Sequence, residues 1–383
     1  MSWEQRLHTA LQQRRDQDLW RQRAQLSSAQ GTEVTCNGEH KLNFCSNDYL
    51  GLAAQGGDDL AAAAERWQLG SGSSHLVCGH SNAHHALEDA LAKLTGYPRA
   101  ILFSTGYMAN LAAVTALTDR HDAVFGDKLN HASLIDAAQL SEAKHIRYKH
   151  ADVAALDARL SSSSAKDKLV ITDGVFSMDG DMAPLPELVA SCNKNNAWLM
   201  VDDAHGLGVL GNSGAGTLQH FAVNNKDVAV LVGTLGKAFG TFGAFVAGSE
   251  ALIETLIQSA RSYIYTTALP VAVAEATRAS LKIIQTDNQR REHLHSLIQR
   301  FRGGAEQLGL PLMPSATAIQ PLVIGEASRA MAMSDSLLER GILVSAIRPP
   351  TVAEGSSRLR ITLSAAHSET EIDQLLSALE SLA

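Results

Sequence analysis

Short apolar runs alternate with helix-like stretches through the middle of the chain, from about residue 85 to about residue 285. The apolar runs cover 100–103, 123–125, 169–172, 198–201, 228–232 and 244–247. The stretches between them, over 84–94, 106–117, 133–140 and 185–195, have the spacing of helices. This alternation predicts a mostly parallel sheet covered by helices, in which ligands bind in the loops that follow the carboxyl ends of the strands.

The pattern differs at both ends of the chain. Residues 2 to about 24 carry apolar residues at helical spacing and predict an amphipathic helix, and Asn37-Gly38 between two short strands predicts a hairpin. After about residue 286 we expect a small α+β domain, with helices over 288–307, around 327–340 and from about 369, and strands at 319–324, 343–345 and 358–362. We therefore predict an N-terminal segment (1–50) that joins the small domain, a large α/β domain (51–285) and the C-terminal small α+β domain (286–383).

Composition narrows the function classes. The chain has 383 residues, of which 45% are hydrophobic and 19% charged, as in a globular protein. Its net charge of −8 argues against nucleic acid or an anionic membrane as the main partner. Four cysteines without C-x-x-C spacing, no signal peptide and no apolar run long enough to span a membrane predict a cytoplasmic protein.

One lysine has an unusual setting, in Gly233–Gly240 directly after an apolar run. A desolvated lysine has a lowered pKa and a nucleophilic amine, as Schiff-base chemistry requires, so Lys237 is a candidate for that role. A solvated lysine in a surface turn is equally compatible with this stretch alone. A phosphate-binding P-loop is excluded, because that motif needs glycine at 231 and Ser or Thr at 238, where the chain has Leu231 and Ala238.

A second loop gives Lys237 a chemical partner. Asp202 ends a buried run and His205 follows three residues later. Pyridoxal phosphate needs a carboxylate that keeps its pyridine nitrogen protonated and a lysine that holds its aldehyde. Its phosphate needs a helix N-terminus, which Ser104–Tyr107 would provide, and Thr234 offers a hydroxyl.

Two other patterns compete with this hypothesis. Gly206–Gly211 matches G-x-G-x-x-G and would indicate a dinucleotide enzyme, but the run continues into a polar, glycine-rich stretch and is not expected to open a helix. A histidine- and cysteine-rich region would indicate a metal site, but its spacing fits no zinc pattern, and the flanking Gly70–Ser74 stretch favours a flexible active-site loop. That region contains Cys78, His80, His84 and His85.

Taken together, the motifs resemble those of the α-oxoamine synthases, a branch of the fold-type I pyridoxal-phosphate enzymes. The resemblance runs nearly end to end and is carried by Ser46–Leu52, Gly174–Asp181, Val201–Gly206 and Gly233–Gly240, with a finer match at Asn130–Ser133, Ile347–Val352 and Ser364–His367. It implies a large seven-stranded, mostly parallel sheet domain with helices on both faces and a small α+β domain.

The resemblance also implies site residues. Lys237 would carry the cofactor as an internal aldimine and act as acid and base, with Asp202 at the pyridinium nitrogen, His205 and Ser177 at the ring hydroxyl and His131 stacked on the ring. The phosphate would be held by Gly106, Tyr107, Thr234 and, across a homodimer interface, Thr266. Substrate would be bound by Arg21, Asn47, His131, Thr351 and Arg360. From the residues alone, His131 could instead be a helix N-terminal residue beside Asn130, Thr351 could simply end a turn, and Arg358 is an alternative to Arg360.

Within that branch, the finer match is to members that condense L-alanine with a pimeloyl thioester and release carbon dioxide and the thiol carrier. Coenzyme A and acyl carrier protein both remain open as the carrier. The alternatives are a glycine-using member of the 2-amino-3-oxobutyrate ligase or 5-aminolevulinate synthase type, an NAD(P)-dependent dehydrogenase, and a protein that only binds its ligand. The resemblance implies no metal, no nucleic acid and no membrane.

Overall fold

The computed structural model describes residues 1–17 and 19–382. It divides into two compact units. The large unit comprises Leu50–Ser177 and Asp181–Arg291, and the small unit comprises Met1–Tyr49, Met178–Gly180 and Glu292–Ala383. Each unit is described below by itself.

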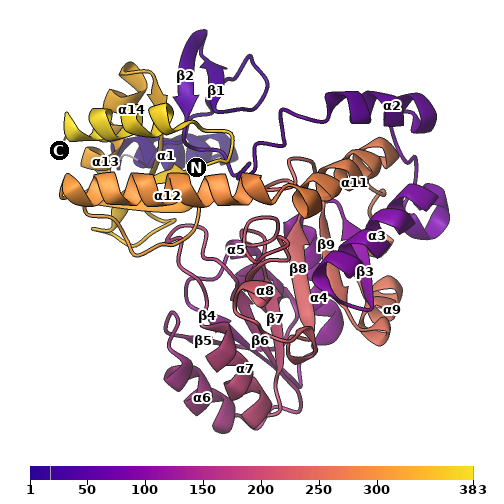
Figure 1. Cartoon of the computed structure of the whole chain (residues 1–383). Helices are drawn as coiled ribbons and strands as arrows, with labels where there is room; N and C mark the ends of the chain where they lie inside the picture. The colour runs from indigo at the N-terminus through magenta and orange to yellow at the C-terminus, as the bar shows by residue number, and fades with distance from the viewer. Residues whose placement is uncertain (18, 383) are drawn as a thin grey trace. The chain divides into compact units, whose positions relative to one another are not determined.

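The large unit is built on one seven-stranded sheet within the described residues, in the order β3-β9-β8-β7-β6-β4-β5 (Figure 1). Only β9 runs antiparallel to its neighbours, so the other six strands end at the same edge. The strands are β3 (Arg99–Phe103), β4 (Ala123–Asp127), β5 (Lys144–Tyr148), β6 (Lys168–Asp173), β7 (Trp198–Asp202), β8 (Val230–Thr234) and β9 (Ala244–Gly248).

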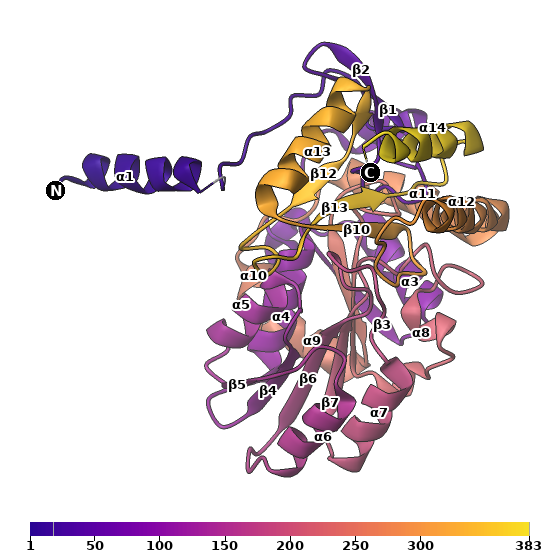
Figure 2. The same ribbon diagram turned by 90° about the vertical axis from the view of Figure 1, so that its left-hand side faces the viewer.

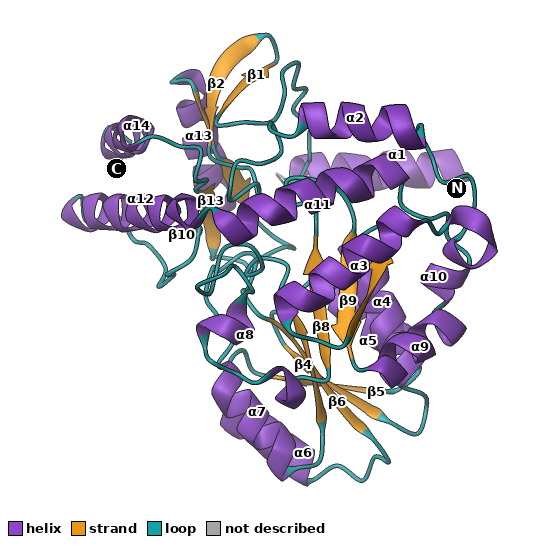
Figure 3. Cartoon of the chain, turned by 45° about the vertical axis from the view of Figure 1, so that its right-hand side comes forward, coloured by secondary structure: helices purple, strands orange, loops and turns teal. Residues whose placement is uncertain are grey.

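Helices cover both faces of this sheet, with α4 and α5 on one side and α7 on the other (Figure 2). Figure 3 shows the same layers, with α9 beside α4 and α6 beside α7. The helices of this unit are α2 (Gly57–Trp67), a π-helix (His75–Gly79), α3 (Asn82–Thr95), α4 (Gly106–Leu117), α5 (Ala132–Leu140), α6 (Val153–Ser161), α7 (Leu185–Lys194), α8 (Thr217–His220), a 3-10 helix (Asn225–Asp227), α9 (Glu250–Ser259), α10 (Arg261–Ile264) and α11 (Val271–Thr286).

The core follows from the alternation of side chains along each strand. In β3, Ile101 and Phe103 pack with α4 and α9 residues in one apolar cluster, while Leu102 between them is also fully buried. Because helices cover both faces of the sheet, side chains on both faces of the central strands are buried and apolar. This confirms the predicted α/β architecture of a mostly parallel, helix-covered sheet.

The small unit contains two three-stranded sheets, ordered β1-β2-β11 and β10-β13-β12 in the described chain. In the predicted hairpin, Asn37 (φ 50°) and Gly38 (φ 87°) both adopt the left-handed conformation that a tight turn between strands requires. The elements are α1 (Trp3–Asp16), β1 (Glu33–Cys36), β2 (Glu39–Asn43), α12 (Asn288–Gln307, whose first residues belong to the large unit), β10 (Ile319–Gly325), α13 (Ala327–Glu339), β11 (Ile342–Leu343), β12 (Ser345–Ile347), β13 (Ser357–Thr362) and α14 (Glu369–Glu380).

Two expectations about these elements were wrong. The first helix ends at Asp16 rather than near 24, and none of its residues is buried, because the arginine-rich stretch that follows has no apolar stripe to continue it. The edge strand β5 was not predicted, because Lys144–Tyr148 is mostly polar and only Tyr148 is buried. Within the described residues, no helix is long and apolar enough to cross a membrane.

An ion-paired histidine fastens the loop that carries Ser177. Asp181 belongs to the turn in which Val175 pairs with Met182. The His150 ring lies 3.0 Å (Nδ1) from Asp127 Oδ1 and 2.8 Å (Nε2) from Asp181 Oδ2. Burial by itself would lower the pKa of His150, but hydrogen bonds to the two carboxylates and their charges raise it to about 10. The protonated ring therefore joins the end of β4 to this turn.

We expect His150→Gln to lower the free energy of unfolding by about 2 kcal/mol near pH 6, less than for a fully buried pair because the side chain is 26% exposed. Because the folded-state pKa is the higher one, this stabilisation is complete below the ordinary histidine pKa of about 6.5 and is lost as the pH rises through about 10. Denaturant unfolding at several pH values should show the gap between wild type and variant closing. The same change at the exposed His220 should have no such effect, and a gap that stayed constant up to pH 10 would contradict the assignment.

Candidate active site

The predicted site residues of the large unit gather at the carboxyl edge of the sheet. Asp202 is the last residue of β7, and Thr234 is the last of the neighbouring β8. Lys237 follows in the turn after β8, and Gly106 opens the helix after β3. Because parallel strands end at one edge, residues far apart in the sequence come together here.

Lys237 and His205 face each other across this edge. Nζ of Lys237 lies 3.1 Å from Nε2 of His205, and His205 is only 8% exposed. Asp202 is 6% exposed, and its Oδ1 accepts the N–H of Ala204 at 3.1 Å. The structure thus places an amine, an imidazole and a buried carboxylate at the ends of two adjacent strands. Lys237 is half-buried and contacts His205, so it is not the fully solvated lysine of a surface turn.

The N-terminus of α4 forms an anion-binding end beside them. The Oγ1 of Thr105 caps the helix by accepting the N–H of Met108 at 3.2 Å. A β-carbon built on Gly106 would lie 3.9 Å from Cβ of Thr234, so the helix terminus and the end of β8 are neighbours. The Tyr107 hydroxyl donates to Asp136, which leaves the backbone N–H as the group that Tyr107 offers to an anion.

His131 occupies a helix-terminal position, as the structural alternative predicted, because it is the N-cap of α5. Its N–H donates to Asp173 Oδ2 at 2.7 Å, and its Nδ1 lies 2.7 Å from Oγ of Ser133. As a whole residue, His131 is nevertheless exposed. Atoms packed around the ring lower the pKa of His131, which the charge of Asp202 opposes.

Three residues that form hydrogen bonds with Asp202 or His131 were not predicted from the sequence. They are Asn110, Ser133 and Asp173. Asp173 ends β6 next to Asp202, and burial, followed by the charge of Asp202, raises its pKa. Its position at a strand end, like that of Asp202, was a usable signal. Asn110 lies within α4, and nothing in the sequence distinguishes it from other helical asparagines.

Tight packing explains the glycines of the Gly206–Gly211 run, and the first of them packs against Asp203. This carboxyl group is fully buried and accepts the N–H of Thr217 at 2.7 Å, and burial raises its pKa to about 8. A β-carbon on Gly206 or Gly216 would lie about 2 Å from a carboxylate oxygen of Asp203. Residues 206–216 form turns and bends, and the next helix begins only at Thr217. The run therefore lacks the helix N-terminus that a dinucleotide site requires.

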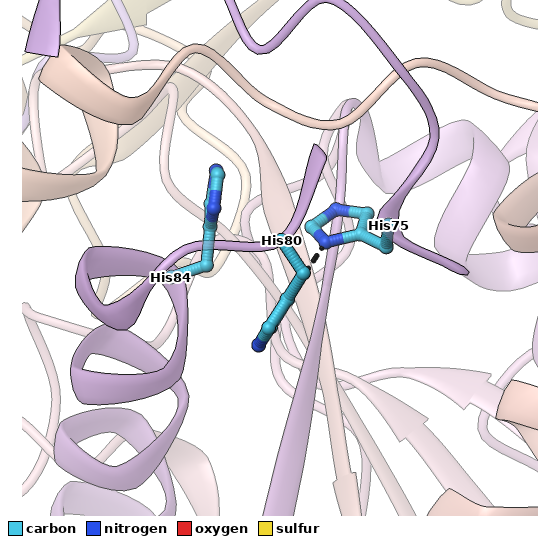
Figure 4. A group of neighbouring side chains, drawn as sticks. All are labelled: His75, His80 and His84. Atoms are coloured by element: carbon cyan, nitrogen blue, oxygen red, sulfur yellow. Dashed lines mark hydrogen bonds between the residues drawn. The ribbon is translucent and has the colours of Figure 1, made fainter. Parts of the chain in front are cut away.

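The histidine-rich region is a hydrogen-bonded cluster on the π-helix and α3 (Figure 4). Nδ1 of His75 lies 2.9 Å from Nδ1 of His80. His84 has partners at both ring nitrogens, since Nδ1 accepts the N–H of Ser81 at 3.0 Å and Nε2 lies 2.6 Å from the carbonyl oxygen of Leu269. The three rings come close enough to share an ion, but His84 would have to give up an existing contact to bind it.

Arg21 and Thr351 line one groove of about 960 Å³ in the small unit. Three further arginines line the same groove, so it is locally basic although the chain is acidic. They are Arg15, Arg23 and Arg348.

Arg358 and Arg360 differ in their partners. Arg358 Nη1 lies 2.6 Å from Asp179 Oδ1, so its charge is paired. Arg360 Nη2 donates to Oδ1 of Asn47 at 3.1 Å, a neutral amide. The second arrangement joins the two residues expected at the same substrate carboxylate.

The remaining two site residues lie in loops of the large unit. Ser177 follows β6 at the end of the large unit's first segment. Thr266 follows α10 and lines a small cavity with His75 and Ser104.

With this geometry in place, comparisons with known proteins are informative. A family model for aminotransferase class I and II matches residues 39–379. The 8-amino-7-oxononanoate synthase of Pseudomonas syringae pv. syringae (strain B728a) is 61% identical over 376 residues, covering 98% of this chain and 95% of that protein. The chain belongs to the 8-amino-7-oxononanoate synthases. A crystal structure of 8-amino-7-oxononanoate synthase from Francisella tularensis is 34% identical, with a TM-score of 0.78 over 89% of this chain and 97% of that one.

The family model and the solved relatives indicate pyridoxal phosphate as the cofactor. A solved structure described as SPT with a PLP internal aldimine is 30% identical and has a TM-score of 0.93, covering 98% of this chain and 96% of that chain. The residues present fit the cofactor, because an amine, a buried carboxylate and a capped helix N-terminus stand at one sheet edge. The fold-type I architecture expected from the sequence is thereby confirmed.

Proposed function

We propose that this chain condenses L-alanine with a pimeloyl thioester, giving 8-amino-7-oxononanoate, carbon dioxide and the free thiol carrier in biotin biosynthesis. The observation that carries the proposal is the meeting of Lys237 and His205 next to Asp202, in a chain 61% identical to a named synthase. The four cysteines of the chain are free thiols, which fits our proposal that the enzyme works in the cytoplasm.

We assign the following roles to the large unit. Lys237 would hold the cofactor's aldehyde, and the bound cofactor would supply an electron sink for charge developing at the α-carbon of the amino acid. The amine of Lys237 would take the α-proton of L-alanine and later return a proton to the product. Asp202 would hold the proton of the pyridine nitrogen, and His205 and Ser177 would position the ring hydroxyl.

The remaining residues bind and orient. The α4 N-terminus at Gly106 and Tyr107, with Thr234, holds the phosphate. His131 covers the cofactor ring and contacts the substrate. Asn47 and Arg360, which already contact each other, bind a substrate carboxylate. Holding both substrates in one orientation contributes to rate, and excluding water protects the reacting carbon.

Lys237→Ala should abolish both the visible band of the lysine-bound cofactor, at roughly 420 nm, and condensation activity. In the wild type, L-alanine should shift that band, and the thioester should then yield product that mass spectrometry detects. Lys166→Ala, at a 78% exposed lysine, is the matched control and should behave as wild type.

The same assay distinguishes the alternatives. Productive turnover with glycine in place of L-alanine would indicate a glycine-using relative. A protein that stayed colourless with pyridoxal phosphate and oxidised or reduced a nicotinamide cofactor would indicate a dehydrogenase.

We further propose that the basic groove of the small unit receives the phosphate-bearing arm of the acyl carrier, with Arg21 and Thr351 nearest the acyl chain. Coenzyme A and acyl carrier protein both present a phosphopantetheine arm, so the groove suits either. The four arginines that line the groove favour an anionic ligand there, although the chain as a whole has a net charge of −8.

We expect Arg21→Ala to raise the KM for pimeloyl-coenzyme A by about tenfold, with little change in the KM for L-alanine, because a charged contact to the acyl substrate is worth about 1.4 kcal/mol. The effect should shrink as salt is raised from 0.05 to about 0.5 M. Arg340→Ala, an exposed arginine of the same unit, is the control. Equal KM changes for both substrates would contradict the assignment, and repeating the series with pimeloyl-acyl carrier protein tests which carrier docks.

A homodimer with shared active sites is the last element of the proposal, with Thr266 reaching the phosphate of the partner subunit's cofactor. It is supported by exposed apolar residues near Thr266, namely Leu76 (49%), Val77 (77%) and Tyr265 (72%). The first two belong to the π-helix His75–Gly79, and the Ser74–Thr267 bridge joins their segment to that of Tyr265. Sedimentation should give twice the mass of one chain, and Val77→Lys with Tyr265→Lys should give monomers. Trp198→Lys, at a comparably exposed side chain elsewhere, should remain dimeric. A wild-type monomer with full activity would contradict the shared site.

A further inference from the structure

A continuous hydrogen-bonded chain of side chains joins Asp202 to His131. Nδ2 of Asn110 lies 2.6 Å from Asp202 Oδ2 and 2.8 Å from Ser133 Oγ. Oγ of Ser133 in turn lies 2.7 Å from His131 Nδ1. Asn110 and Ser133 are each 1% exposed, so water does not compete for these bonds.

We propose that Asn110 and Ser133 are positioning residues that hold His131 as the tautomer with its proton on Nε2 and tie its orientation to Asp202. This inference rests on the proposed function for its kinetic consequences, whereas the proton arrangement stands on the hydrogen bonds alone.

The orientation of the Asn110 amide fixes the direction of the chain. The reverse orientation would bring Oδ1 to 2.6 Å from the Asp202 carboxylate and set two acceptors against each other. With Nδ2 on that side, Oδ1 of Asn110 is buried without a hydrogen-bond partner among the described residues. A buried oxygen left without a partner is costly, so the two bonds donated by Nδ2 are what the site maintains.

The proton positions follow from this orientation. Because Nδ2 only donates, Ser133 Oγ accepts from it and must send its own proton to another acceptor. That acceptor is His131 Nδ1, which also faces the backbone N–H of Ser133 at 3.3 Å. Nδ1 thus receives two donors and carries no proton of its own. The neutral ring therefore has its proton on Nε2.

The backbone of His131 is held from the opposite side. Its N–H donates to Asp173 at the end of β6, and the N–H of Asp173 faces Asn130 Oδ1 at 3.3 Å. Asn130 Nδ2 donates to the carbonyl oxygen of Ile171 at 2.8 Å. With backbone and Nδ1 both engaged and the residue as a whole still exposed, Nε2–H is the group that His131 offers to a ligand. His131 is accordingly a hydrogen-bond donor in this site and not a base.

This arrangement makes a prediction about coupling. If Ser133 acts only through His131, Ser133→Ala should lower kcat by about tenfold in the wild type and by less than twofold when His131 is already Gln. Ser133→Thr, which keeps the hydroxyl, should restore most of the loss. Asn110→Leu should retain part of its effect in the His131→Gln background, because it also releases Asp202.

A readout without turnover separates this inference from the proposed function. Nitrogen NMR of the full chain with ¹⁵N-labelled histidine, with and without pyridoxal phosphate, should show His131 with Nδ1 unprotonated and Nε2 protonated, assigned by its loss in His131→Gln. Ser133→Ala should give an averaged or mixed tautomer signal. A proton on Nδ1 in the wild type, or equal kinetic losses from Ser133→Ala in both backgrounds, would overturn the inference. A wild type without condensation activity would refute the proposed function and leave the NMR result to decide this one.

Discussion

A carboxylate at the buried end of a central strand is the constraint around which the site is organised. Asp202 is 6% exposed, and an ionised carboxylate in that position needs donors or a cation. The chain supplies the Asn110 amide and the Ala204 N–H, and in the proposed function the protonated ring nitrogen of pyridoxal phosphate would be the third partner. The neighbouring strand β8 places Lys237 in the turn that follows it, at the same edge of the sheet.

The second consequence of this constraint is that the site's residues cannot be independent. Asn110 contacts Asp202 and Ser133 together, and Ser133 contacts His131. A change at the ring-binding carboxylate is therefore transmitted to the imidazole expected on the cofactor's face. Buried polar chains of this kind specify one geometry because each member is needed to satisfy the next.

The sequence was sufficient for the architecture, because the central strands are buried on both faces and appear as unbroken apolar runs. It failed at Lys144–Tyr148, where an edge strand has too little burial to leave that signal, and past Asp16, where a few apolar residues did not extend a helix. For the candidate site, the positions of Lys237, Asp202 and His205 were predictable because each lies at the end of a recognisable strand or just after it, while their roles remain predictions. Asn110 was not, since its importance arises only when α4 packs across β7's end, a contact that spacing within the helix does not encode.

Packing also explains the misleading signals. The glycines at 206, 208 and 211 are required because a β-carbon at each would come within 3 Å of Asp203, Ala238 or Gln219. Their spacing also happens to match the G-x-G-x-x-G fingerprint of dinucleotide-binding proteins. The histidines at 75, 80 and 84 cluster through hydrogen bonds to one another and to the backbone. In both regions the sequence pattern indicated a ligand site, whereas the contacts in the structure are internal packing and hydrogen bonds.

Trapping the lysine-bound cofactor chemically tests the central assignment most directly. The purified protein, loaded with pyridoxal phosphate, is reduced with borohydride, digested and mapped by mass spectrometry. The mass of the cofactor is expected on Lys237 alone, and excess L-alanine added before reduction should remove it. A label on another lysine, or a Lys237 label that L-alanine leaves unchanged, would contradict it.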